Sequence, residues 1–167
     1  MPRTVVIAGV GPGLGASLAH RFAAEGCRVG LLARSAAYVE ELATDLDRET
    51  PGEALAVPTD IADRDAVEAA FAAVRESFGP VDVLVNHASA ASWRGLRAAD
   101  AEGFRRALAV NVEGAFHCSQ EAVADMVEGD GGTVVFTGAT TSVRGREGAV
   151  GFSAAKFGAR GLAESMC

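Results

Sequence analysis

Hydrophobic residues along this chain form short continuous runs, which alternate with longer stretches where they recur every three or four positions. The runs cover residues 5–7, 29–32, 54–57, 81–85 and 133–136. They are too short for helices and predict buried strands. The stretches with helical spacing cover residues 14–22, 39–46, 67–78, about 100–127, and the chain from about 152 onward. The order predicted is a strand followed by a helix, repeated along the whole chain.

The predicted strands are apolar on both faces, which is typical of a parallel sheet covered by helices on each side. We therefore expect an α/β fold, a Rossmann-like doubly wound parallel sheet. No linker or change in composition divides the chain, so residues 1–167 are expected to form a single dinucleotide-binding domain. Residues 161–167 stop inside a helical pattern, without a stop signal or a following strand. This pattern predicts a sheet that is incomplete at its C-terminal edge, in a chain that ends within the helix carrying Lys156.

The composition of the chain excludes some classes of binding partner. The net charge is −7 and no basic cluster is present, which disfavours nucleic acid and anionic membranes as ligands. No apolar run approaches the roughly 18 residues of a membrane span, and Met1 leads almost directly into a strand instead of a leader peptide. A cytoplasmic protein is expected, whose partner is a small molecule or another subunit.

Potential metal ligands are scattered. The three cysteines and three histidines show no ligand spacing, so we expect free thiols and no metal site; they are Cys27, Cys118, Cys167, His20, His87 and His117.

A glycine-rich loop, AGVGPGLG, joins the first strand to the first helix at residues 8–15. Glycines there allow a tight turn and a close approach of backbone to phosphate, while the helix N-terminus offers free N–H groups. The loop lacks the GK[ST] ending of a P-loop, which excludes a P-loop ATPase or GTPase. A methyltransferase remains the rival, but it favours an acidic residue before the loop and another after the second strand. This chain has Ala8 and Ala33-Arg34 at those places.

The residue after the second strand, Arg34, indicates which of the two nicotinamide cofactors the chain prefers. An acidic residue after the second strand would bind the ribose 2′-hydroxyl of NAD, whereas an arginine suits the 2′-phosphate of NADP. The sequence therefore favours NADP(H) over NAD(H).

With these residues in order, the whole chain resembles the short-chain dehydrogenase/reductase family. The matching segments are Gly9, Gly13 and Gly15 for TGxxxGxG, Asp60-Ile61 after the third strand, Asn111-Val112-Glu113-Gly114 for NVxG, and Lys156 for the lysine of YxxxK. Ala8 replaces the threonine of the first motif, and Asn86-His87-Ala88-Ser89 stands where the family has NNAG but differs from it at two of four positions.

The resemblance implies hydride transfer between NADP(H) and a carbonyl or alcohol substrate. It implies a cofactor site formed by Gly9, Gly13, Leu14, Gly15, Arg34, Asp60, Ile61, Asn86 and Lys156, with the aspartate near the adenine. It also implies that Asn111 holds a water linked to Lys156, and that the lysine binds the nicotinamide ribose and lowers the pKa of a catalytic tyrosine. Lys156 is the only lysine among 15 basic residues, so background composition does not explain its position.

Two departures put catalysis in question. The tyrosine position, four residues before Lys156, is Phe152, and the serine position thirteen residues earlier is Ala139. The loss of a general acid typically lowers a rate about 10²- to 10⁴-fold. Other residues nearby could in principle donate a proton, but they lie outside the family's spacing and are interpreted as structural residues. They are His87, Thr140, Thr141, Ser142 and Ser153. Trp93 is read as a packing residue.

Three functions stay open at this stage. The first is an oxidoreductase of this family with weak or altered catalysis. The second is a non-catalytic module in which cofactor binding or oligomerisation is the purpose. The third is an inactive truncated product. The helices from about residues 100 and 152 commonly form subunit interfaces in the family, so a homo-oligomer is an open alternative.

Overall fold

A computed structural model describes residues 1–166. Its centre is a sheet of five parallel strands in the order β3-β2-β1-β4-β5. The strands are β1 Thr4–Ala8, β2 Arg28–Ala33, β3 Glu53–Pro58, β4 Val83–Asn86 and β5 Thr133–Phe136. The helices are α1 Leu14–Ala24, α2 Ala36–Glu49, α3 Arg64–Phe78, α4 Ala101–Leu108, α5 Gly114–Glu128 and α6 Val150–Ser165. The expected doubly wound α/β fold is confirmed.

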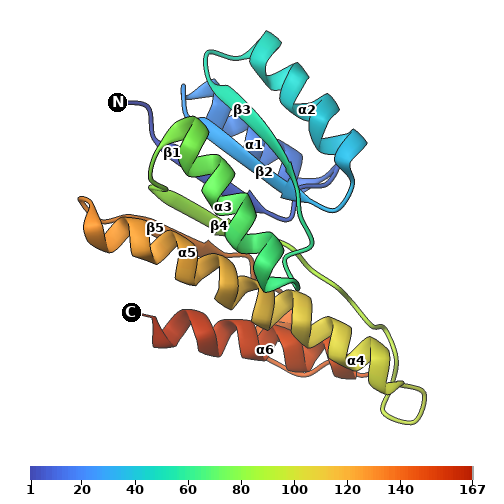
Figure 1. The fold of residues 1–167 in the computed structure, drawn as a ribbon. Coiled ribbons are helices and arrows are strands. Elements are labelled where there is room, and N and C mark those ends of the chain that lie inside the picture. The colour runs from blue at the N-terminus through green and yellow to red at the C-terminus, as the bar shows by residue number, and fades with distance from the viewer. Residues whose placement is uncertain (167) are drawn as a thin grey trace.

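Helices cover the sheet on both faces (Figure 1). One core cluster joins β1, β2 and β4 to α1 and α2, and includes Ile7, Leu31 and Leu46. A second cluster lies under α3 and α5 on the opposite face, with Phe71 and Leu84 fully buried. The central strand β1 is buried on both faces, because helices pack on each side of it.

Several sequence predictions need correction. The helix expected at 100–127 is interrupted by a π-helical turn, Ala109–Glu113, between α4 and α5. Helix α6 begins at Val150, two residues before the expected start, and β4 begins at Val83 instead of residue 81. The outer strands β3 and β5 are only partly buried, because each has a neighbouring strand on one side only within residues 1–166.

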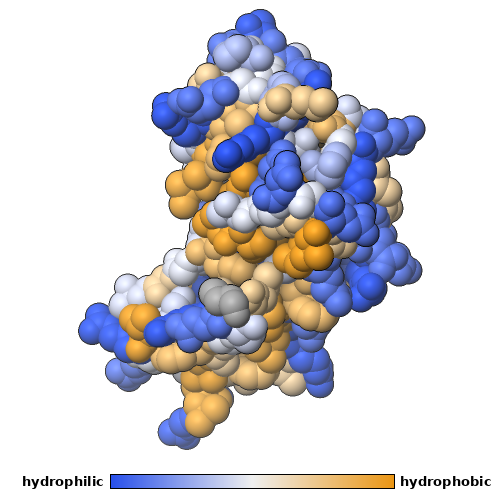
Figure 2. Space-filling model, turned by 90° about the vertical axis from the view of Figure 1, so that its left-hand side faces the viewer, coloured by the Kyte–Doolittle hydropathy of each residue, from blue (hydrophilic) through white to orange (hydrophobic). Residues whose placement is uncertain are grey.

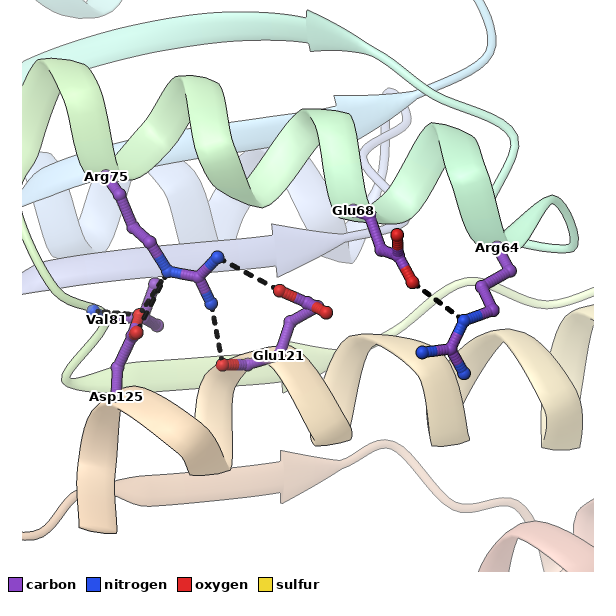
Figure 3. A network of polar contacts seen from close by, with 6 residues as sticks. All are labelled: Arg64, Glu68, Arg75, Val81, Glu121 and Asp125. Carbon is purple, nitrogen blue, oxygen red and sulfur yellow. Dashed lines mark hydrogen bonds and ion pairs between the residues drawn. The ribbon is translucent and has the colours of Figure 1, made fainter. Parts of the chain in front are cut away.

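An ion-pair network ties α3 to α5 on one face of the sheet (Figure 3). The guanidinium of Arg75 donates to both carboxylate oxygens of Asp125 at 2.9 and 3.0 Å and to Glu121 at 3.0 Å. Asp125 also accepts the backbone N–H of Val81 at 3.0 Å. Because Val81 precedes β4, this carboxylate fixes the start of that strand as well as the helix pair.

The surface mixes polar and apolar residues. On the side that carries both chain ends, apolar residues gather in the middle and hydrophilic residues surround them (Figure 2). Val135 on β5 is 40% exposed and Val127 on α5 is 78% exposed. No helix within residues 1–166 is both long enough and apolar enough to cross a bilayer.

Candidate functional site

A cleft of about 690 Å³ lies at the carboxyl ends of β1, β2 and β3. The carboxyl edge of a parallel sheet is where ligands bind in open α/β folds. The cleft is lined by the glycine loop, by residues that follow β2, β3 and β4, and by residues of α4 and the π-helical turn; they include Gly9, Gly13, Leu14, Gly15, Arg34, Asp60, Ile61, His87, Ala88, Arg106 and Val110. Seven of the nine residues expected to bind cofactor therefore share one cavity.

Gly9 makes the turn at the end of β1. Its φ of 108° lies in the left-handed region, and a Cβ there would overlap the backbone of Ala88 after β4. The backbone N–H groups of Gly9 and Val10 both donate to the carbonyl of Leu32, at 2.8 and 3.1 Å. The loop is thereby held against β2 on one side and against β4 on the other.

The N-terminus of α1 points its first residues into the cleft. Gly13 is the N-cap and supplies no side-chain cap, and a Cβ on it would meet nothing within 4 Å. Gly13, Leu14 and Gly15 all line the cavity. An uncapped helix N-terminus with open space before it suits a phosphate group. The loop thus fits the diphosphate of a dinucleotide.

Arg34 and Asp60 lie at the far end of the cleft from β4. Arg34 is exposed just after β2, and Asp60 follows β3. Burial alone would raise the pKa of the Asp60 carboxyl. The Ala62 N–H and the Arg106 guanidinium outweigh that effect and lower the pKa below its usual value, with Arg34 contributing. The carboxylate therefore stays ionised.

Lys156 is 6% exposed, and its Nζ donates to the carbonyl of Thr137 at 3.1 Å. Burial lowers its pKa. The hydroxyl of Thr137 hydrogen-bonds Nδ1 of His87 at 3.1 Å, so one threonine connects both titratable groups. Burial and the nearby Lys156 charge lower the pKa of His87. These shifts favour a neutral imidazole near pH 7.

Asn111 sits in the π-helical turn and is 3% exposed. Its amide donates to the carbonyls of Ala90 and Ala107, at 2.8 and 2.9 Å, and its carbonyl accepts from Ser89 at 3.0 Å. Single π-helical turns within α-helices frequently occur at functional sites. Here the turn ties α4 to the segment after β4.

Asn86, Asn111 and Lys156 line a small internal cavity of about 10 Å³, which shares Ile61, Ala88 and Val110 with the main cleft. Asn86 donates to Ser119 at 3.0 Å, while its carbonyl oxygen is buried without a hydrogen-bond partner among the described residues. The structure thus places these three residues directly behind the cleft.

Phe152 occupies the position where the family's tyrosine would stand. Its ring centroid lies 5.0 Å from that of Trp93, and 5.8 Å from Nζ of Lys156. Trp93 therefore packs on α6, and the Arg146 guanidinium lies 5.2 Å from its indole centroid.

The nearby hydroxyls are used by the backbone or buried. Ser142 Oγ accepts the N–H of Ala139 at 3.0 Å, and Ser153 Oγ accepts the N–H of Arg146 at 3.3 Å. Thr141 is 3% exposed. Neither hydrogen bond involves Lys156. Thr140 alone of the four is exposed.

Sequence reasoning did not select Arg106, Thr137 or Ser119, which hold Asp60, Lys156 and Asn86 respectively. Their residue types are common at any surface, and no local spacing distinguishes them. Cys27 and Cys118 are free thiols, and burial raises the pKa of Cys118 to about 12; Cys167 lies outside the described residues. No three potential metal ligands converge within residues 1–166.

Known proteins match along the whole chain. A family model described as short chain dehydrogenase matches residues 3–167. A 3-oxoacyl-[acyl-carrier-protein] reductase of Mycobacterium tuberculosis is 31% identical over 98% of this chain and 62% of its own length. A meso-2,3-butanediol dehydrogenase of Serratia marcescens is 32% identical over 98% of the chain and 64% of its own. The chain thus spans a little over three fifths of these relatives.

Solved structures agree with the fold. An alcohol dehydrogenase of Thermococcus sibiricus, complexed with 5-hydroxy-NADP, superposes with a TM-score of 0.95 at 27% identity, over 99% of this chain and 70% of that one. The L-sorbose reductase of Gluconobacter frateurii, complexed with NADPH and L-sorbose, gives 0.94 at 26% identity, over 99% and 63%. With its glycine loop, its cleft and its family model in agreement, this chain belongs to the short chain dehydrogenase family.

Proposed function

We propose that the protein binds NADP(H) and belongs to the part of this family that transfers hydride between the cofactor and a carbonyl or alcohol, with weak or altered catalysis. The observation that carries the proposal is the cleft. It brings the uncapped N-terminus of α1, the exposed Arg34 and the ionised Asp60 into one cavity of about 690 Å³. The two structural relatives described above contain NADPH or a modified NADP.

Each part of the cofactor has a matching group. The N-terminus of α1 would hold the diphosphate, Arg34 the 2′-phosphate and Asp60 the adenine edge. Lys156 and Asn111, behind the cleft, would support the nicotinamide end. Bound NADPH supplies a hydride to the carbonyl carbon, and a proton must reach the carbonyl oxygen to complete the alcohol.

Proton delivery is where this chain departs from the family. Phe152 and Ala139 carry no hydroxyl. Nζ of Lys156 lies 5.8 Å from the Phe152 ring centroid, and Thr137 links Lys156 to His87. We therefore expect cofactor binding to be strong relative to turnover. A non-catalytic cofactor-binding module is the weaker candidate, because the named relatives are reductases and dehydrogenases.

Titration of the purified chain with NADPH and with NADH, followed by cofactor fluorescence, tests the proposal. We expect saturable binding that prefers NADPH, and loss of this preference in Arg34→Gln. Arg21→Gln is the matched control, since Arg21 is an exposed residue of α1 that pairs with Glu25. Binding of neither dinucleotide would refute the proposal, and equal binding in the unaltered chain would refute the role of Arg34.

Assembly and location are further parts of the proposal. An outer stripe of α5 carries Phe116 and Val127, 41% and 78% exposed, and Phe157 on α6 is 44% exposed. Exposed apolar residues at helical spacing favour packing of a second copy. Light scattering after size-exclusion chromatography would show a dimer mass, and Phe116→Asp would lower it.

The free thiols of Cys27 and Cys118 suit the reducing cytoplasm.

A further inference from the structure

Asp60 and Arg106 form an ion pair that faces the cleft. One terminal nitrogen of Arg106 lies 2.9 Å from Oδ2 of Asp60 and 3.3 Å from Oδ1. The two side chains come from the segment after β3 and from α4, 46 residues apart. Both line the cleft, and they are 39% and 38% exposed respectively. Such a half-exposed pair contributes little to stability, so its position suggests a role in binding.

The pair fixes the direction of the carboxylate. Oδ1 of Asp60 also accepts the backbone N–H of Ala62 at 3.1 Å, which anchors it to its own turn. With Arg106 on the other side, the carboxylate is restrained by two elements. An ionised carboxylate offers about four acceptor sites, so one more donor has room to bind.

Part of the cleft lining is apolar. Leu32, Ile61 and Val110 line the same cleft, from the end of β2, the turn after β3 and the π-helical turn. Apolar walls with a fixed carboxylate at the edge suit a flat heterocycle that carries an amino group, because the ring faces are weakly hydrated and the amine donates to a charged acceptor.

We propose that Arg106 is a positioning residue for purine recognition. By holding the Asp60 carboxylate in one orientation, it makes the cleft select the 6-amino group of adenine over the 6-oxo group of hypoxanthine. The inference rests on the proposed NADP(H) binding and adds to it a specificity-determining residue that acts through Asp60. A purely structural Arg106 would affect both bases equally.

The test compares NADPH with its hypoxanthine analogue, titrated by cofactor fluorescence into the full chain. The two dinucleotides differ in the 6-substituent of the purine and in the N1 proton that the 6-oxo form carries. For the unaltered chain we expect NADPH to bind about 10-fold more tightly, as for a hydrogen bond to a charged group. Arg106→Gln should reduce this preference to about 2-fold or less, mainly by weakening NADPH binding. Arg106→Lys should restore part of it.

Arg105→Gln is the matched control. Arg105 is the neighbouring residue on α4 but is exposed and does not line the cleft, so this variant should keep the full preference. Melting curves for all four proteins check that the ratio comes from folded chains. A preference that survives Arg106→Gln and Arg106→Lys unchanged, or an equal loss for both dinucleotides, overturns the inference alone. Failure of the unaltered chain to bind either dinucleotide overturns the proposed function together with it.

Discussion

Nζ of Lys156 lies 5.8 Å from the centroid of the Phe152 ring, one helical turn earlier on α6. Where the family has a phenol whose proton the lysine helps to release, this chain has a phenyl ring packed on Trp93. The ammonium is in place, but the group whose pKa it would lower is absent.

Restoring both hydroxyls should raise the rate of carbonyl reduction. We expect Phe152→Tyr with Ala139→Ser to increase NADPH-dependent reduction of small ketones about 10²- to 10⁴-fold, the usual contribution of a general acid. Phe157→Tyr is the control, because Phe157 is 44% exposed on the same helix. Absorbance at the NADPH band measures the rate. If the double variant binds NADPH as tightly as the parent and gains no rate, the missing hydroxyls do not limit catalysis.

The buried charge of Lys156 should lower the free energy of unfolding of the chain, while the same side chain supports cofactor binding. Burial lowers its pKa in the folded chain, so the folded state binds fewer protons than the unfolded state between the folded and unfolded pKa values. The free energy of unfolding therefore rises with pH across that window, and the penalty is fully present below it. Lys156→Met should stabilise the chain by about 1 kcal/mol at neutral pH and weaken NADPH binding.

Two measurements check this trade-off. Denaturant unfolding should show the gain for Lys156→Met and a change of no more than about 0.5 kcal/mol for Arg160→Met, because Arg160 pairs with Glu164 on the exposed side of the same helix. A carbon-13 label in lysine gives a single side-chain signal, since Lys156 is the only lysine. A titration midpoint at or above the ordinary value for lysine would contradict the premise.

Alanine substitutions at two glycines of the same loop should have different effects, one on stability and the other on cofactor binding. Gly9→Ala combines a φ of 108° with overlap against Ala88, so we expect it to destabilise the fold by about 2–4 kcal/mol. Gly13→Ala meets no neighbouring atom and has a φ of −121°, so the fold should keep its stability. Its methyl group would stand where phosphate approaches, and NADPH binding should weaken. Thermal melts and titrations together separate the two effects, and equal melting temperatures for the two variants would be the contrary result.

Asp125 should be the most costly charge to remove from the α3–α5 contact. Asp125→Ala takes away the partner of a half-buried Arg75 and the acceptor of the Val81 N–H, and we expect a loss of about 2–3 kcal/mol. Glu68→Ala removes an exposed pair with Arg64 on the same helix and should change stability by less than about 0.5 kcal/mol. Urea unfolding of both variants measures the difference. A similar small loss for both would mean that the network is too solvated to matter.

The fold was predictable because its signals are local. A run of apolar residues marks each strand, and the glycine loop marks the first strand-to-helix turn. Those signals could not reveal the π-helical turn at Asn111, since its residues also suit a regular helix. They placed Gly9, Arg34 and Asp60 at successive strand ends, and the parallel sheet then brings these ends to one edge.

The order of strands and helices, the family motifs and the absence of hydroxyls at residues 139 and 152 can all be derived from the sequence alone. The contacts between distant side chains emerge from the fold: Arg106 with Asp60, the Thr137 carbonyl with Lys156, and Trp93 with Phe152. Hydrophobic periodicity and turn geometry depend on near neighbours along the chain and carry no information on these contacts. Each such pair joins common residue types that lie far apart in the sequence. The pairs form because of the way in which the helices pack on the sheet.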